Sequence, residues 1–397
     1  MSKDRINEKK HRRHVRLFAF LALLVRPFFR KKFNYVWDDL SEIEGPYLLL
    51  CNHNTNYDPV FVGLAASKQL YFVASEHVTR NRFLWRLLDF IFAPIIHHKG
   101  KAGVNTVAEM LRCLKAGYNV AIFPEGNRSF NGLTCPFLST IGKLARKSGA
   151  KLITYKLEGG YLTQPRWGFT LRKGKLAGKL VHVYDAEELK GMTDDEVNSA
   201  IERDLYEDAF KTQEKEHIAF KGKKLAYGLE TTLFTCPKCK RIGLLKSSGT
   251  DISCECGYRA EYNEFGELIN ADGSKTTVAA WDAFQRENLE KEIMTANASH
   301  SDRVLFEDEI KLQHINDEHA VTESRKIMLR AYCDHVELGE KSLVLSDIAG
   351  VAVHSRNTIV AYDAATGSQY EIKGTNELFN ALKYLYLYEI MKSQASC

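Results

Sequence analysis

Short apolar runs and longer amphipathic stretches alternate along the chain between residues 46 and 157. The apolar runs predict buried strands, and the stretches in which apolar residues recur every three or four positions predict helices. The expected strands are 47–51, 71–75, 94–97, 120–123 and 152–155, and the expected helices are 59–68, 82–92, 104–116 and 141–147. This alternation indicates an α/β fold with a mixed, mostly parallel sheet and flanking helices.

The pattern changes in the second half of the chain. Thr193 and Glu196 have the spacing of a capping box, which predicts a helix from there to about residue 215. A cysteine-containing stretch, a charged helix over 281–296, period-2 runs from residue 304 and a closing helix over 376–392 follow. We therefore expect five parts. They are a basic amphipathic segment (1–35), the α/β domain (36–230), a small ribbon (231–270), a helical linker (271–302) and a small β-rich domain closed by a helix (303–397).

The net positive charge of the chain comes from its first 35 residues. They hold 11 Lys or Arg against two acidic residues, so this segment is +9 and the rest of the chain carries −4 of the total of +5. Its apolar run, 17–25, is shorter than the roughly 20 residues that span a bilayer, and no small-residue cleavage site follows. We expect a helix in the interface of an anionic membrane. The alternatives are a helix covering a groove of the same protein and, more weakly, a nucleic-acid arm.

Composition excludes several classes of protein. Hydrophobic residues make up 45% of the chain, charged residues 26%, and only 8 residues are proline. These values indicate a core-forming protein rather than a disordered, collagen-like or multi-span membrane protein. Nine cysteines are too few for a disulfide scaffold and indicate a reducing compartment. We therefore expect a peripheral or monotopic protein at the cytoplasmic face of a membrane.

A histidine and an aspartate follow the first predicted strand, in the sequence NHNTNYDP (52–59). His53 comes just after the carboxyl end of that strand, where α/β sheets form their ligand crevices. Asp58 precedes Pro59, and a role as helix N-cap alone would explain it. The turn also allows the Asp58 carboxylate to fold back onto one imidazole nitrogen, which leaves the other nitrogen as a general base.

A second strand end carries Glu125, Gly126, Asn127 and Arg128. Gly126 permits a sharp turn after the strand, and Arg128 offers a planar, multidentate grip on a phosphate. Glu125 is placed to orient that arginine or to accept a hydrogen bond from an acceptor hydroxyl. The alternative is a surface turn with a local ion pair.

A third strand end supplies His97, His98 and Lys99. Because the carboxyl ends of parallel strands meet at one edge of a sheet, we expect this cationic cluster to lie near His53 and Arg128. The combination suits transfer of an acyl group to an alcohol on a phosphate-bearing substrate. His53 would take the hydroxyl proton, the alkoxide would attack a thioester, and the cations would hold the phosphate.

These motifs resemble those of the glycerolipid acyltransferase family, which includes lysophosphatidate acyltransferases. NHNTNYD is similar to the family's NHx4D box, FPEGNRS (123–129) is similar to FPEGTRS, and IHHK (96–99) has Lys99 where the family carries arginine. The resemblance covers about residues 15–215. It implies His53 and Asp58 as a catalytic dyad without a covalent acyl-enzyme, a donor that is acyl-CoA or acyl carrier protein, and no metal in the reaction. It also implies substrate binding by Lys99, Glu125, Gly126, Asn127 and Arg128.

The chain departs from the family in its fourth expected block and in the run that follows it. The strand at 152–155 lacks the usual proline, and the run GGYLTQPRW (159–167) follows it. We expect a lysophospholipid as acceptor, such as 1-acyl-glycerol-3-phosphate in phospholipid synthesis. The alternatives are the same chemistry on a glycolipid or an aminoacyl lipid, or a membrane adaptor without catalysis. Cys51 is expected to be a core residue of its strand rather than a nucleophile.

Four cysteines have the spacing of a metal site. Cys236 and Cys239 form CxxC, and Cys254 and Cys256 form CxC after fourteen residues. This is close to the pattern of a zinc ribbon, so we predict a structural Zn²⁺ with four thiolate ligands and no open position for catalysis. A disulfide would require an oxidising compartment. The surrounding charge is mixed, so no nucleic-acid partner is expected, and the ribbon is expected to brace domains or bind a protein.

The last part, 303–397, looks like a small barrel of the pleckstrin-homology or GRAM type, with several antiparallel strands followed by one helix. Fold analogy alone suggests lipid or protein binding for it.

Overall fold

The structure is a computed structural model of the chain that describes residues 6–97, 103–299, 302–316, 321–344, 348–363 and 369–395. The described residues form two compact units, the first within Met1–Pro165 and Arg172–Phe220 and the second within Arg166–Leu171 and Lys221–Cys397. The division after Phe220 lies ten residues before the predicted end of the α/β domain at 230. The second unit contains the predicted ribbon, linker and β-rich domain together.

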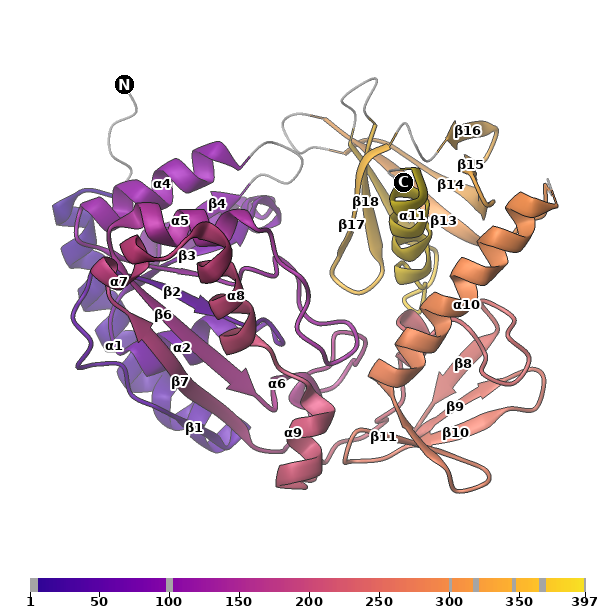
Figure 1. The fold of residues 1–397 in the computed structure, drawn as a ribbon, viewed down its shortest axis with the longest axis horizontal. Coiled ribbons are helices and arrows are strands. Elements are labelled where there is room, and N and C mark those ends of the chain that lie inside the picture. The colour runs from indigo at the N-terminus through magenta and orange to yellow at the C-terminus, as the bar shows by residue number, and fades with distance from the viewer. Residues whose placement is uncertain are drawn as a thin grey trace. The chain divides into compact units, whose positions relative to one another are not determined.

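The first unit is built on one mixed sheet (Figure 1). In the described part of the chain its order is β1 (Tyr35–Trp37), β7 (Leu176–Tyr184), β6 (Lys151–Glu158), β2 (Tyr47–Cys51), β5 (Asn119–Ile122), β3 (Leu70–Ser75) and β4 (Ile95–His97). Neighbouring strands pair in parallel, except β6 with β7. This confirms the expected mixed, mostly parallel sheet.

Helices cover both faces of this sheet (Figure 1). On one face, Leu48, Leu50 and Leu152 pack with buried side chains of α4 (Val104–Lys115), α5 (Thr140–Ser148) and α8 (Asp194–Leu205). On the other face, the Tyr35 hydroxyl donates to the carbonyl of Phe61 in α2 (Asp58–Ala66). Alternate residues of β2 pack on opposite faces of the sheet, because successive side chains of a strand point in opposite directions.

The first unit also contains α3 (Arg82–Ile91), α6 (Gly160–Thr163), α7 (Ala186–Gly191) and α9 (Ala209–Glu216). The Thr193 capping box is present at the start of α8. The prediction of one helix to residue 215 was wrong, because Tyr206 leaves the helical region at ψ 124° and Asp208 caps a new helix by accepting hydrogen bonds from the backbone of Phe210 and Lys211.

Helix α1 (Glu8–Phe33) is longer than the apolar run that predicts it. The Asn7 side chain caps its start by accepting a hydrogen bond from the Lys10 backbone, and Pro27 lies inside it. His14, Phe29 and Phe33 are buried, whereas Phe20 and Leu23 are 60% and 73% exposed. Among the described residues, no helix is both long and apolar enough to cross a membrane.

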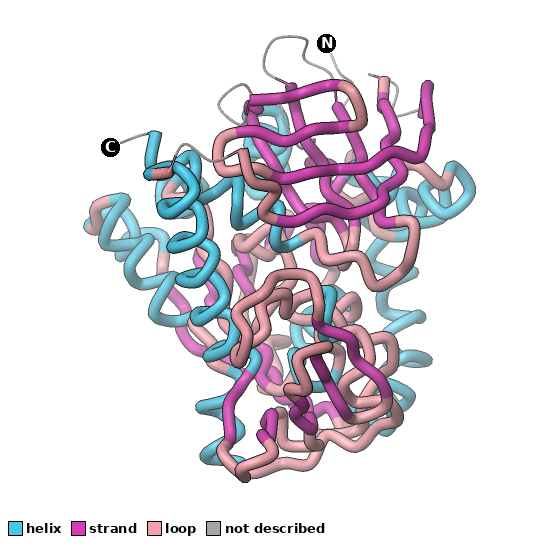
Figure 2. Tube along the Cα trace, turned by 90° about the vertical axis from the view of Figure 1, so that its right-hand side faces the viewer, coloured by secondary structure: helices cyan, strands magenta, loops and turns pink. Residues whose placement is uncertain are grey.

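The second unit contains two antiparallel sheets (Figure 1, Figure 2). Within the described residues, one has the order β12 (Lys275–Thr277), β11 (Glu267–Asn270), β10 (Arg259–Tyr262), β9 (Asp251–Cys254) and β8 (Leu245–Ser248). The other has the order β16 (Lys341–Val344), β15 (His335–Leu338), β14 (Val321–Ala331), β13 (Phe306–Ile315), β19 (Gln369–Gly374), β18 (Thr358–Asp363) and β17 (Ile348–His354).

Two α-helices complete the described part of the second unit. Helix α10 (Val278–Ala298) follows the smaller sheet, as the sequence predicts for 281–296. Helix α11 (Leu382–Ala395) closes the chain and buries Leu382, Leu387 and Ile390. It begins six residues later than the predicted helix over 376–392. The expected β-rich domain with a closing helix is therefore present.

Candidate active site

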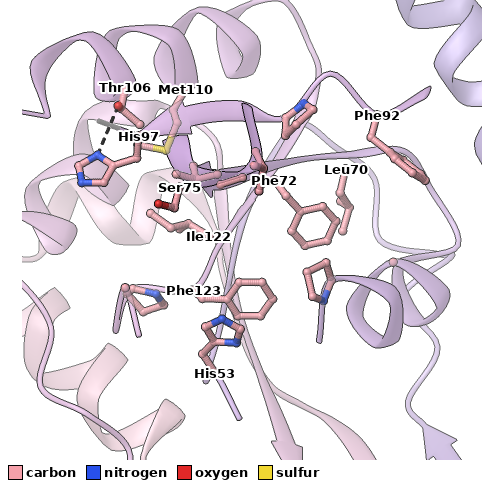
Figure 3. A pocket seen from close by; sticks show the side chains of 18 of the residues that line it. His53, Leu70, Phe72, Ser75, Phe92, His97, Thr106, Met110, Ile122 and Phe123 are labelled. Atoms are coloured by element: carbon pink, nitrogen blue, oxygen red, sulfur yellow. Dashed lines mark hydrogen bonds between the residues drawn. The ribbon is translucent and has the colours of Figure 1, made fainter. Parts of the chain in front are cut away.

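His53 and Asp58 form a hydrogen-bonded pair at the carboxyl end of β2. His53 Nδ1 lies 2.8 Å from Asp58 Oδ2, and the His53 side chain is 22% exposed while that of Asp58 is fully buried. The His53 ring stacks on the ring of Phe123, with centroids 4.5 Å apart (Figure 3). The expectation that the carboxylate folds back onto the imidazole is confirmed. A carboxylate at Nδ1 leaves Nε2 as the nitrogen that can accept a proton.

Asp58 is the centre of the turn that carries His53. Its Oδ2 accepts hydrogen bonds from the backbone N–H groups of Asn54 (2.6 Å) and Thr55 (2.9 Å), and its Oδ1 accepts one from the Thr55 hydroxyl (2.5 Å). The N-cap of α2 is Tyr57, and Asp58 is the first helical residue. The explanation of Asp58 as an N-cap alone is therefore wrong, because its carboxylate serves the turn and the imidazole.

Glu125 connects the second strand end to His53. Strands β2 and β5 are parallel neighbours, which brings their carboxyl ends together. Glu125 Oε1 accepts a hydrogen bond from the His53 backbone N–H (2.6 Å), and Oε2 accepts one from the Cys135 backbone N–H (2.6 Å). The residue is 8% exposed, and burial raises the pKa of its carboxyl to about 8, although these two hydrogen bonds act in the opposite direction.

The rest of the FPEGNRS loop lies beside His53. The backbone N–H of Ser129 donates to the His53 carbonyl (2.9 Å), so Arg128 is one residue from this contact. Gly126 has φ 63°, the left-handed conformation that favours glycine, and is exposed. Asn127 and Arg128 are half-buried. Their binding of an acceptor, like that of Glu125 and Gly126, stays a prediction.

The third strand end is described only in part. His97 ends β4, and its Nδ1 lies 3.5 Å from the Thr106 hydroxyl; in Figure 3 this pair lies apart from His53. His98 and Lys99 lie outside the described residues. The predicted role of Lys99 in substrate binding therefore stays a prediction.

A buried glutamate that the sequence analysis did not identify lies on the other side of the NHNTNYD turn. Glu207 Oε2 accepts hydrogen bonds from the side-chain amides of Asn52 (2.9 Å) and Asn54 (2.6 Å). It is 4% exposed, and burial raises the pKa of its carboxyl to about 8. No sequence signal marks Glu207. It lies outside any motif, and the Asn54 side chain that it contacts is 153 residues earlier in the chain.

The run after β6, which departs from the family pattern, packs against the same turn. A Cβ at Gly160 would lie 2.9 Å from the Cβ of Asn54, so glycine is required there for the close approach. The Gln164 side-chain oxygen accepts a hydrogen bond from the Asn56 backbone (3.0 Å). Cys51 is fully buried, as expected for a core residue, and burial raises the pKa of its thiol.

A large cavity of about 1460 Å³ opens beside His53. Most of its lining is apolar and comes from α1, α2, β3, α4, β5 and α5, with His53 and Phe123 among the side chains that border it (Figure 3). Phe18, Val25 and Phe29 of α1 form part of its wall. A cavity with a mostly apolar lining and the His53 imidazole at its border suits a ligand with a long hydrocarbon chain and a reactive end.

The four cysteines of the ribbon lie together, with all four sulfur atoms within 4.8 Å of one another. The Sγ atoms of Cys236 and Cys256 are 3.6 Å apart, and those of Cys239 and Cys254 are 3.8 Å apart. Tetrahedral coordination at 2.3 Å would separate the sulfurs by about 3.8 Å. The group can therefore hold a metal ion. The eight cysteines of the described residues are all free of disulfides.

Comparison with known proteins bears on this site. Residues 32–158 match the family model described as Acyltransferase. A chloroplastic 1-acyl-sn-glycerol-3-phosphate acyltransferase, BAT2, from Brassica napus is 22% identical over 157 residues, which cover 39% of this chain and 44% of that relative. The chain thus spans less than half of the length of that relative.

Several solved structures are similar to parts of the chain, and two of them concern its two units. The 1-acyl-sn-glycerophosphate acyltransferase PlsC from Thermotoga maritima is 19% identical, with a TM-score of 0.39, over 47% of this chain and 79% of that one. The N-terminal PH domain of human ARAP2 is 12% identical, with a TM-score of 0.18, over 23% of this chain and 81% of that one. The match to the family model includes the His53 and Glu125 motifs, so the part of the chain that carries the site is similar to the acyltransferase family.

Proposed function

We propose that this protein is an O-acyltransferase that moves a fatty acyl group from a thioester to the hydroxyl of a lysophospholipid. The observation that carries the proposal is the His53–Asp58 pair, with a 2.8 Å hydrogen bond, at the border of the large apolar cavity. A base fixed by a buried carboxylate serves proton transfer, and the apolar cavity is suited to an acyl chain.

In this reaction His53 acts as general base. Asp58 accepts a hydrogen bond from the Nδ1–H group, and Nε2 takes the proton of the acceptor hydroxyl as its oxygen attacks the thioester carbonyl carbon. The tetrahedral intermediate then collapses, the carbon–sulfur bond breaks, and the imidazolium returns the proton to the leaving thiolate. The products are an acyl ester and a free thiol, which in the donors we propose belongs to coenzyme A or acyl carrier protein.

Arg128 and Lys99 are the proposed phosphate-binding residues of the acceptor site. Arg128 lies one residue from the Ser129 contact with His53, which places its backbone close to the proposed base. A guanidinium binds phosphate through several directed hydrogen bonds, and holding the phosphate would keep the acceptor hydroxyl near the imidazole. Glu125, with both oxygens bonded to backbone N–H groups, acts in this proposal by fixing the His53 turn.

The exposed surface of α1 and α3 is the proposed membrane-binding face. Arg13 of α1 lies over the Phe90 ring of α3, 4.1 Å from its centroid, so the helices are neighbours. Phe20, Leu23 and Phe83 are 60%, 73% and 80% exposed on them. Exposed aromatic and aliphatic side chains with nearby cations suit an anionic lipid surface. Leu23→Glu should weaken flotation with anionic vesicles, and equal flotation of both proteins would contradict this face.

The four-cysteine group is the proposed site of a structural Zn²⁺. Four thiolates complete a tetrahedral site, so the ion would stabilise the fold of the ribbon and take no part in acyl transfer.

An acceptor screen tests the proposed function. The purified full chain is incubated with a labelled acyl-CoA, or acyl carrier protein loaded with the same chain, and anionic vesicles containing lysophosphatidate, a glycolipid or an aminoacyl lipid. Transfer to lysophosphatidate supports the proposal. Transfer only to another lipid would identify that lipid as the acceptor. Lipid binding without transfer to any of these lipids would contradict the proposal that the protein is an enzyme.

A further inference from the structure

We propose that Glu207 is a positioning residue for this reaction, acting on His53 and Asp58 through Asn54. The inference rests on the proposed function of the His53 site. Glu207 lies beyond residues 32–158, the stretch that matches the acyltransferase family model, and belongs to neither of the motifs that identify the site.

Asn54 links the glutamate to the dyad. Its side-chain amide donates to Glu207 Oε2 (2.6 Å), and its backbone N–H donates to Asp58 Oδ2 (2.6 Å), the same oxygen that contacts His53 Nδ1. Glu207 therefore holds the residue that follows His53, and that residue in turn holds the carboxylate that orients the imidazole. A shift of Asn54 would move both members of the dyad.

Asn52, on the other side of His53, has an anchor that does not depend on Glu207. Its side chain donates to the Leu157 carbonyl (2.9 Å) and accepts from the Leu157 N–H (2.7 Å), which fixes it to β6. Asn54 has only a longer second contact, 3.4 Å to the Leu157 carbonyl. The Glu207 carboxylate is thus the principal restraint on the Asn54 side chain, and its loss would loosen the turn on the Asp58 side.

The backbone of Glu207 reaches the other half of the site. Its N–H donates to the Thr134 hydroxyl (2.8 Å), and its carbonyl accepts from the Thr134 N–H (3.0 Å). Thr134 precedes Cys135, whose backbone N–H donates a hydrogen bond to Glu125. Glu125 in turn accepts a hydrogen bond from the backbone N–H of His53. The hydrogen bonds therefore form a closed ring through Glu207, Asn54, His53, Glu125 and the 134–135 segment. Such a ring fixes the distance between the two loops of the site.

The donors around Glu207 explain why a side chain with two acceptor oxygens occupies this position. Glu207 is 4% exposed, Asn54 is 3% exposed, and Glu207 Oε1 also faces the Gly159 N–H at 3.3 Å. Glu207 therefore meets donors on both oxygens, and an amide side chain would place its own N–H₂ against one of them. Glu207→Gln keeps the size of the side chain but replaces one acceptor oxygen by a donor. The variant therefore tests the hydrogen bonds of Glu207 rather than the space that its side chain fills.

The test compares Glu207→Gln with Asn54→Ala, the double variant and Glu216→Gln. Glu216 is a matched control, because it is a partly exposed glutamate of the first unit that pairs with Lys175. We expect kcat to fall about 10- to 100-fold in Glu207→Gln with KM within about twofold, since small misplacement of a catalytic group costs rate rather than binding. The double variant should be little slower than the slower single one. Glu216→Gln should match the wild type.

A measurement that needs no turnover accompanies the kinetics. With ¹⁵N-labelled histidine, the Nδ1 proton shared between His53 and Asp58 gives a downfield resonance, assigned by its loss in His53→Gln. We expect this resonance to broaden or shift in Glu207→Gln and to stay unchanged in Glu216→Gln. If Glu207→Gln does not fold, Glu207→Asp, which retains both acceptors but is shorter by one methylene, replaces it.

The outcomes separate the two proposals. An unchanged resonance with unchanged kcat in Glu207→Gln, while the wild type transfers acyl groups, overturns the positioning role and leaves the proposed function standing. A rise in KM alone in Glu207→Gln would also overturn the positioning role. So would a loss of kcat in the double variant that equals the product of the losses in the two single variants. If the wild type transfers nothing but the resonance responds to Glu207→Gln, the reaction is wrong and the positioning of His53 by Glu207 stands.

Discussion

The Nδ1 atom of His53 lies 2.8 Å from Oδ2 of Asp58, and the same oxygen accepts hydrogen bonds from the backbone N–H groups of Asn54 and Thr55. One buried carboxylate thus orders both the turn and the imidazole that the turn carries. Because the turn follows β2, a buried strand at the centre of the sheet supports the reactive group.

Asp58→Asn should lower kcat by about 10³- to 10⁴-fold, because an amide that donates to Nδ1 favours the wrong imidazole tautomer. The variant should also unfold at lower urea concentration, since an amide oxygen replaces only part of the acceptors that serve Asn54, Thr55 and His53. Asp195→Asn, an exposed change in α8, is the control. Wild-type kcat in Asp58→Asn, in a steady-state assay, would show that the carboxylate is not needed.

Stability should decrease as the pH rises from about 5 to 8. Burial raises the pKa of Glu125 and of Glu207 to about 8, above the value near 4.3 of an unfolded chain. The folded state then binds protons more tightly, so this contribution is complete below pH 4 and is lost as the pH passes the folded pKa. Glu207→Gln should flatten the dependence in urea titrations across this range. If stability fell equally steeply with pH in Glu207→Gln and in the wild type, the raised pKa of Glu207 would be contradicted.

Gly63→Phe should shorten the acyl chains that the enzyme accepts. Gly63 borders the cavity on α2, and a Cβ there would meet only a ring carbon of Phe18 at 3.5 Å, an ordinary contact. Gly63→Ala should therefore keep wild-type rates, whereas a phenylalanine would extend into the cavity. We expect about a tenfold loss of kcat/KM with long-chain thioesters and little loss with short ones. Equal losses at every chain length would place the acyl group elsewhere.

Cys239→Ser should remove the metal and lower the thermal stability of the second unit. The wild type should contain one zinc per chain by mass spectrometry, because four thiolates within 4.8 Å complete one site. Cys333→Ser alters a buried cysteine outside that group and should retain the metal. A wild-type protein that binds no zinc when refolded with it would contradict the site, whatever the stability of Cys239→Ser.

The sequence predicts those parts of the site that depend on neighbouring strand ends. His53 and Glu125 follow strands with clear apolar patterns, and parallel pairing of β2 with β5 brings them into contact. Glu207 could not be found in this way, since its contact with Asn54 joins residues 153 positions apart through the packing of α8. Local signals also miss the break at Tyr206, where tertiary contacts of Glu207 with Thr134 compete with helix continuation.

Two neighbouring strands on one side of the first sheet, β1 and β7, were not predicted from the sequence. Strand β1 has three residues, and β7 pairs antiparallel with β6 and exposes much of one face. The three residues of β1 are apolar but too few to mark a strand, and glycine and lysine interrupt the apolar residues of β7. The central strand β2, buried at every position, has the predicted bounds.

The central claim is that the His53 imidazole is the base for acyl transfer. The most direct measurement is the single-turnover rate of transfer from a labelled thioester to lysophosphatidate in anionic vesicles, for the wild type and for His53→Ala at equal protein loading. We predict transfer by the wild type and a rate at least about 10³-fold lower in His53→Ala, with unchanged vesicle binding. Transfer at the wild-type rate by His53→Ala would contradict the account.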